Sequence, residues 1–244
     1  MFAVLHWLDA PLTAPYRWTM LGAIVISACY WSVKARRDPA LLPVFIGALG
    51  GAFVGAKVAY LFAEGWHDWP MADHWQRIAA GKSIIGGLLG GYGGVELMKW
   101  ITGYQKSTGD RFALILPVGI ALGRVGCCMQ GCCLGKPTAL QFFSVRDEQG
   151  IPRWPASEVE LGFQLVLLTL MWLLRRDLRF KNRLIFLYFI CYGVFRFVHE
   201  FMRAEPLMFF KFSGYHVLAL ITAAVGWLMF VRRGNEASRQ SLHA

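Results

Sequence analysis

The stretch Gly123-Arg124-Val125-Gly126-Cys127-Cys128-Met129-Gln130-Gly131-Cys132-Cys133-Leu134-Gly135 lies mid-chain and closes an apolar run that begins at Phe112. It places an arginine at the end of a segment apolar enough for a membrane. A charge at membrane depth is costly, so it usually faces a cavity or a charged partner. The glycines suggest backbone that bends or that a ligand can approach closely. We interpret Arg124 as a functional charge; the alternative is a glycine-rich helix end with an arginine that reaches the membrane surface.

The composition indicates that much of this chain is surrounded by lipid. Of its 244 residues, 56% are hydrophobic and only 16% are charged, and the mean hydropathy is +0.44. Soluble domains have about 45–50% apolar and roughly 25% charged residues, so we predict a multi-pass membrane protein. The net charge of +10 does not indicate a nucleic-acid partner, because no basic stripe lies on a soluble segment. Basic residues concentrated in cytoplasmic loops explain the excess.

The apolar segments predict seven transmembrane helices in a single membrane domain over residues 1–244, after an amphipathic lead at 1–16. We place the spans at about 18–33, 40–63, 84–101, 112–134, 158–174, 184–203 and 215–231. The run 112–122 is too short to cross alone at roughly 1.5 Å per residue, so we expect it to continue into the glycine- and cysteine-rich stretch or to stop beside a cavity. In the second span, Gly47, Gly51 and Gly55 recur at the spacing that lets helices pack closely in lipid. Met1–Leu12 lacks a basic region and contains Asp9, so we expect no cleavable signal peptide.

Basic clusters determine the predicted orientation. They lie at alternate span ends, at 34–37, 106–111, 175–183 and 232–233. Because basic residues favour cytoplasmic loops, we predict an N-terminus outside and a C-terminus in the cytoplasm. Arg124, the polar loop 136–155 and the charges at 196–205 then share the outer side. The sequence therefore predicts an all-α polytopic membrane protein whose buried charges gather in one leaflet.

Two buried arginines on different helices suggest an anion site. Arg124 and Arg196 can hold one phosphate together, because the planar guanidinium group matches phosphate oxygens. A phospholipid headgroup is the natural anion at that depth. Glu200 lies at i+4 from Arg196 and three residues before Arg203, so these side chains can form a charge network. The alternative interpretation is an ion-pair network that only holds the helices together.

Four cysteines, Cys127, Cys128, Cys132 and Cys133, lie within seven residues. Zinc sites usually combine two cysteine pairs separated by a longer spacer, which this stretch lacks. Disulfides between such near neighbours need a special backbone. Apolar packing, redox or metal chemistry, and lipid carriage therefore all stay open for this cluster.

The sequence resembles the prolipoprotein diacylglyceryl transferase family in five motifs that follow the family's order. Gly123-Arg124-Val125-Gly126, with Gly131 and Gly135, resembles its GR-x-GN-x₃-G-x₃-G motif. Tyr192-Gly193-Val194-Phe195-Arg196-Phe197, with Glu200 and Arg203, resembles its YG-x-FRF-x₂-EF-x-R motif. The shorter matches are Gly86-Gly87-Leu88-Leu89-Gly90 to the end of HGGLIG, Gly55-Ala56-Lys57 to G-x-R, and Arg153-Trp154-Pro155 with Glu160 to RHPSQLYE.

The resemblance implies an enzyme of the bacterial inner membrane with its site on the periplasmic side. Such an enzyme transfers a diacylglyceryl group from phosphatidylglycerol to a protein cysteine thiol and releases glycerol phosphate. Arg124 and Arg196 would be catalytic. The expected substrate-binding residues are Tyr192, Glu200, Arg203, Gly86, Gly87, Gly135, Lys57 and Cys127. The expected partners are phosphatidylglycerol, membrane lipid, and a prolipoprotein lipobox peptide or another thiol acceptor, with no cofactor and no metal.

Several positions depart from the family pattern. Ile85 occupies the position of the histidine before the glycine pair, which is a proton acceptor in that pattern, and Cys127 and Cys132 replace an asparagine and a glutamate. The thiolate is the nucleophile, so a base is still needed. His199 and His216 are the candidates; the alternative for each is a histidine of the core or interface. A second functional hypothesis is a non-catalytic lipid-binding protein, or a cysteine-based redox or metal protein, on the same fold.

Overall fold

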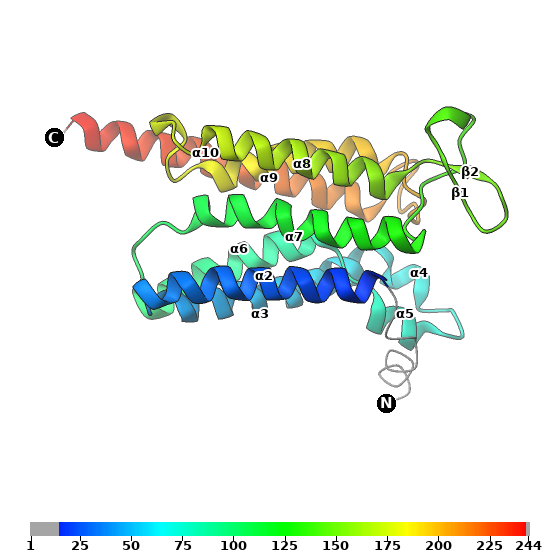
Figure 1. Ribbon diagram of the computed structural model, residues 1–244, viewed down its shortest axis with the longest axis horizontal. Helices are drawn as coiled ribbons and strands as arrows, with labels where there is room; N and C mark the ends of the chain where they lie inside the picture. Colours follow the sequence, from blue (N-terminus) through cyan, green and yellow to red (C-terminus); the bar gives the residue numbers. More distant parts are fainter. Residues whose placement is uncertain (1–14, 243–244) are drawn as a thin grey trace.

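The structure is a computed structural model and describes residues 15–242, so the predicted lead lies outside the described residues except for its last two positions. Within 15–242, seven long helices run along the long axis of the molecule (Figure 1). They are α2 (Pro15–Arg37), α3 (Leu41–Tyr60), α6 (Ile84–Thr102), α7 (Gly109–Gln130), α8 (Ala156–Leu174), α9 (Leu184–Glu200) and α10 (Gly214–Leu242).

Among the described residues, four segments are long and apolar enough to cross a membrane: Leu41–Asp68, Gly109–Gln130, Ala156–Leu174 and Gly214–Glu236. The protein is therefore a mostly helical, multi-pass membrane protein. Its exposed surface fits this, because large apolar side chains such as Phe53, Trp100 and Trp227 are each at least 60% exposed.

Helices α3 and α6 pack backbone against backbone through facing glycines. A Cβ atom added to Gly51 would lie 2.2 Å from the carbonyl oxygen of Gly90, and one added to Gly55 would lie 2.4 Å from that of Gly86. The close packing predicted from the glycine spacing of the second span is thus confirmed. The contact fixes the first turn of α6, whose N–H at Gly86 is also capped by the hydroxyl of Ser83.

Helix α7 contains the short apolar run and continues through the central motif to Gln130. It ends there because Gly131 adopts a left-handed conformation with φ of 64°. The N–H of Gly131 donates to the carbonyl of Cys128, and that of Cys132 donates to the carbonyl of Cys127, as expected for a glycine-terminated helix. The helix therefore ends four residues before Leu134, the predicted end of this span, and Cys132 and Cys133 belong to a loop.

Short elements gather at one end of the bundle, on the right in Figure 1. They are a π-helical turn (Leu61–Gly65) that continues α3, α4 (Trp66–Asp68), α5 (His74–Ala80), a 3₁₀ turn (Gln141–Phe143), and the antiparallel pair β1 (Val145–Arg146) and β2 (Pro152–Arg153). Asp147 holds the β1–β2 turn: it accepts hydrogen bonds from the N–H groups of Gln149 and Ile151 and from the guanidinium of Arg153. The hydrogen bond from Arg153 keeps the pKa of the Asp147 carboxyl below its ordinary value.

Candidate active site

Glu160, near the start of α8, is a fully buried carboxylate that joins three helices. Its Oε2 accepts a hydrogen bond of 2.7 Å from Nη2 of Arg124 on α7 and lies 3.6 Å from Nη1 of Arg196 on α9. Its Oε1 accepts a hydrogen bond of 2.8 Å from the hydroxyl of Tyr192. A buried charge needs such partners, because desolvation is expensive. The two arginines singled out in the sequence thus converge on a shared carboxylate.

Glu200 extends this network to the loop after α9. Its Oε2 lies 2.8 Å from Nη2 of Arg196 and 3.6 Å from Nε of Arg203, and its Oε1 accepts a hydrogen bond of 3.0 Å from the hydroxyl of Ser213. Arg203 also pairs with Glu205. The charge network predicted from the i, i+3 and i, i+4 spacing is present. Helix α9 itself ends at Glu200, so Arg203 lies in the following turn rather than in the predicted span.

The charges of this network balance, but its hydrogen-bond donors are not all used. Three arginines (124, 196 and 203) face three glutamates (160, 200 and 205). Even so, Nε of Arg124, Nη1 of Arg196 and Nη1 of Arg203 are buried and have no hydrogen-bond partner among the described residues. An unsatisfied buried donor is unfavourable. Each of these guanidinium groups therefore has an N–H group that can donate to an added acceptor.

The same three arginines line one cavity of about 660 Å³. Its walls come from α3, α6, α7, α9 and α10 and from the segment 60–83, and Met20 of α2 also contributes. Cys127 and Cys133 lie in the wall beside Arg124, so the cysteine-rich stretch belongs to the cavity.

Gly135 holds the loop of Arg203 in place rather than lining the cavity. Its N–H donates to the carbonyl of Trp154, and its backbone pairs with that of Arg203. A Cβ atom at this position would lie 2.5 Å from the carbonyl oxygen of Met202 and 2.8 Å from Cβ of Trp154. No residue larger than glycine therefore fits without moving the turn that carries Arg203.

Five other predicted substrate-binding residues also lie outside the wall of the arginine cavity. Two of them, Tyr192 and Glu200, belong to the charge network of the arginines. The ammonium group of Lys57 donates to the carbonyls of Ile78, Ala79 and Gly81 at 2.5–2.7 Å, so its three donors are used to hold the end of α5. Gly86 faces α3. Gly87 lines a different cavity, described next.

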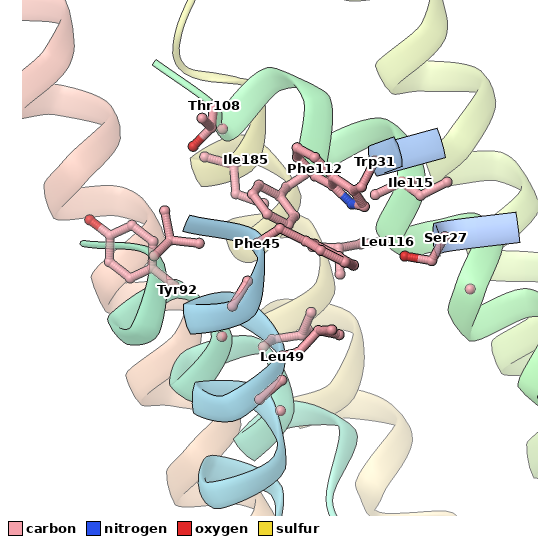
Figure 2. A pocket seen from close by; sticks show the side chains of 18 of the residues that line it. Ser27, Trp31, Phe45, Leu49, Tyr92, Thr108, Phe112, Ile115, Leu116 and Ile185 are labelled. Atoms are coloured by element: carbon pink, nitrogen blue, oxygen red, sulfur yellow. The ribbon is translucent and has the colours of Figure 1, made fainter. Parts of the chain in front are cut away.

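This second cavity, of about 170 Å³, is lined mainly by apolar side chains (Figure 2). Trp31, Phe45, Phe112 and Ile185 lie around it, together with Thr108. Thr108 directly precedes α7, whereas Arg124 lies toward the C-terminal end of that helix. Gly119 of α7 lies in the wall of both cavities. The polar and the apolar cavity are therefore neighbours along the same helix.

The two histidines considered as bases are core residues. Nε2 of His199 accepts a hydrogen bond of 3.2 Å from the indole of Trp154, and Nδ1 of His216 accepts one of 3.0 Å from the N–H of Ser213. Neither residue lines the arginine cavity. Ile85, where the family pattern has a histidine, is 1% exposed and belongs to the main hydrophobic core. The described residues thus place none of these three positions in the cavity wall.

Glu160 is the residue whose importance was missed, because it was noticed only as part of a motif match. Its signal was the one used for Arg124: a charge at the edge of an apolar run. Two acids of the segment 60–83, the half-buried Glu64 and the buried Asp68, gave no such signal, since they follow the second span in a polar stretch. Glu64 accepts a hydrogen bond from the hydroxyl of Tyr215, and Asp68 accepts one from that of Tyr60, and all four line the cavity.

The fold and this site define a multi-pass membrane protein with a cavity lined by buried arginines. Residues 15–232 match the family described as prolipoprotein diacylglyceryl transferase. The chain therefore belongs to the prolipoprotein diacylglyceryl transferase family.

Relatives named phosphatidylglycerol–prolipoprotein diacylglyceryl transferase cover most of the chain. The protein from Azotobacter vinelandii is 30% identical over 196 residues, which is 71% of each chain. The protein from Cupriavidus metallidurans is 29% identical over 213 residues, 80% of this chain and 77% of the relative. The protein from Bordetella avium is 29% identical over 215 residues, 81% of this chain and 78% of the relative.

Proposed function

We propose that this protein transfers the diacylglyceryl group of phosphatidylglycerol to a cysteine thiol of a prolipoprotein and releases glycerol phosphate. Family membership supports the reaction. The observation that carries the proposal to this chain is that Arg124, Arg196 and Arg203 all line one cavity and that each has a buried guanidinium nitrogen without a hydrogen-bond partner.

The phosphate of the lipid headgroup binds at these donors. Arginine and phosphate form strong, charge-assisted hydrogen bonds. The carboxylates of the site already balance the charges of the arginines, and the oxygens of the phosphodiester accept hydrogen bonds from the guanidinium N–H groups that have no such partner. Glu160 and Glu200 then serve to hold the guanidinium groups in fixed positions, and Tyr192 holds Glu160.

The reaction is an alkylation of sulfur. The acceptor thiolate attacks the glyceryl carbon that bears the phosphate, a carbon–sulfur bond forms, and the carbon–oxygen bond breaks. The electron pair of that bond leaves with the oxygen, so negative charge grows on the glycerol phosphate. Fixed guanidinium donors stabilise this growing charge without having to reorganise. Arg124 and Arg196 are the catalytic residues in this proposal.

The acyl chains of the lipid extend toward the apolar cavity of Figure 2. Gly119 lies in the wall of both cavities, so a lipid with its phosphate at Arg124 reaches the apolar one along α7. Gly87 then contacts acyl chain rather than headgroup.

The orientation in the membrane completes the proposal. All seven long helices span the bilayer, and the end that carries β1 and β2 faces the periplasm. The four basic clusters support this, because contacts between Lys106 and Asp38, Asn182 and Asp110, and Arg183 and Phe230 gather them at the opposite end. Basic residues favour the cytoplasmic side. A periplasmic acceptor is thus reachable from the cavity end. The lipobox peptide is one such acceptor.

A transfer assay tests the function. Purified protein, phosphatidylglycerol labelled in its headgroup glycerol and a lipobox peptide should yield labelled glycerol phosphate and lipidated peptide. Arg124→Lys should lower both by about 100-fold or more, because it removes a guanidinium donor from the developing charge. Arg176→Lys, exposed at the other end of the bundle, is the matched control. Lipid binding without any product in the wild-type protein would leave a lipid-binding protein and contradict the transferase.

A further inference from the structure

Three cysteine sulfur atoms converge at the end of α7. The Sγ atoms of Cys127, Cys132 and Cys133 lie within 4.8 Å of one another, and those of Cys132 and Cys133 are 3.8 Å apart. The glycine cap at Gly131 turns the chain back so that the backbone N–H of Cys132 donates a hydrogen bond to the carbonyl of Cys127. Cys133 has φ of 60°, a left-handed conformation that is unfavourable for a residue with a side chain. The backbone thus departs from its preferred conformation where the three sulfurs meet.

We propose that these three cysteines bind one thiophilic metal ion, Zn²⁺, and that its fourth coordination position is open to the arginine cavity. The group consists of sulfur donors alone, which select soft and borderline metals over Mg²⁺ or Ca²⁺. With Zn–S bonds of about 2.3 Å, two sulfurs of a tetrahedral site lie about 3.8 Å apart. Cys132 and Cys133 already have this separation, and Cys127 needs to move by an ångström or less.

The surroundings favour a charged metal–thiolate group open on one side. Cys127 and Cys133 line the cavity together with Arg124 and Arg203. Three thiolates and one Zn²⁺ carry a net charge of −1, and Nη1 of Arg124 lies 3.9 Å from the sulfur of Cys127. Three protein ligands with one open position are typical of catalytic rather than structural zinc.

The role of the open coordination position rests on the proposed function: this position binds the acceptor thiol. A thiol bound to a metal ion loses its proton at neutral pH, and water takes that proton. The resulting thiolate then attacks the glyceryl carbon as described above. Zinc would thus activate the acceptor thiol, for which the cavity wall offers none of Ile85, His199 and His216. The spacing of the four cysteines left metal binding open, although it lacks the two separated pairs of most zinc sites. The fold instead joins one helical and two loop cysteines.

Metal content tests the site without any lipid turnover. Protein purified without chelator or reductant and supplied with Zn²⁺ should contain one zinc per chain. Cys132→Ser and Cys133→Ser should each weaken zinc binding by at least about tenfold, which a chromophoric chelator in competition measures. Both residues are in a loop and partly accessible, so folding is expected to persist, as checked by gel filtration. Cys191→Ser and Cys128→Ser, which alter cysteines outside the group, should keep the zinc.

Cobalt tests the open position. The intensity of the thiolate-to-Co²⁺ charge-transfer band should correspond to three sulfurs in the free protein and to four after a lipobox peptide is added. The same peptide with serine in place of its cysteine should leave the band at three.

The outcomes separate the site from the function. A folded protein that binds neither Zn²⁺ nor Co²⁺, or one with a disulfide between two of the three cysteines, overturns the metal site. A cobalt band that the cysteine peptide does not change overturns the role of the open position. Stoichiometric zinc without lipid transfer keeps the metal site and overturns the proposed function. Lipid transfer by a metal-free protein keeps the proposed function and overturns the role of zinc in it.

Discussion

Nη2 of Arg124 and Oε2 of Glu160 lie 2.7 Å apart, and both side chains are buried in the helical bundle. One residue comes from α7 and the other from α8, so this ion pair both joins two helices and fixes the guanidinium at the cavity wall. Because both charges are buried, each depends on the other.

Replacing Glu160 should therefore impair stability and activity together. Removing one partner of a buried ion pair typically costs about 3–5 kcal/mol, so Glu160→Gln should lower the midpoint of thermal unfolding in detergent. It should also reduce lipid transfer by about tenfold or more, because Arg124 and Arg196 lose their shared carboxylate. Glu148→Gln, exposed in the β1–β2 turn, should change neither. Full activity in Glu160→Gln would mean that the arginines hold their positions unaided.

Tyr192 and its neighbour Tyr188 separate stability from activity. Both are completely buried, their rings stack with centroids 5.9 Å apart, and each hydroxyl donates one hydrogen bond: Tyr192 to Glu160 and Tyr188 to Gln164. Tyr192→Phe and Tyr188→Phe should each cost about 1–3 kcal/mol through an acceptor left unpaired. Only Tyr192→Phe should also lower the rate of transfer, measured at saturating lipid. Equal rates for the two variants would show that Tyr192 has a packing role alone.

Gly135→Ala should weaken lipid binding without touching any cavity residue directly. The added methyl group meets the backbone of Met202, next to Arg203, at 2.5 Å, so the turn that carries this arginine has to shift. We expect a raised KM for phosphatidylglycerol in the transfer assay. Gly162→Ala is the matched control, since its Cβ would meet nothing within 4 Å and alanine favours a helix by up to about 1 kcal/mol. An unchanged KM in Gly135→Ala would indicate that Arg203 does not contact the headgroup.

Lys57 should prove to be a structural residue. Lys57→Met removes the hydrogen bonds to the carbonyls at the end of α5, so proteolysis within residues 69–82 should become faster. The KM for phosphatidylglycerol should change by no more than about twofold. A large rise in KM with unchanged proteolysis would instead place Lys57 at the lipid, as the resemblance to the family motif implied.

The sequence allowed the helical membrane class, the arginine pair and the charge network of Glu200 to be predicted. These follow from local rules: apolar runs of spanning length, charges inside them, and i, i+4 spacing. Glu160 carries the same kind of signal, but it lies beside a polar loop, where a charged residue does not differ from its neighbours in the sequence. The carbonyl partners of Lys57 could not be predicted, because they depend on where a separate short helix packs. Likewise, the meeting of Cys127 with Cys133 depends on the helix cap at Gly131 and on a left-handed cysteine, which residue spacing does not reveal.

The glycine contact between α3 and α6 also bears on how a lipid gets in. With carbonyl oxygens lying where side chains would otherwise be, these two helices have no compressible layer between them and have to move as one rigid pair. A gap cannot open along that seam without exposing backbone to the bilayer. A lipid that diffuses laterally from the membrane into the cavity therefore has to enter between other helices. Helix α2, which contributes Met20 to the cavity wall, has no such glycine contact, since a Cβ atom at its one glycine, Gly22, would meet nothing within 4 Å.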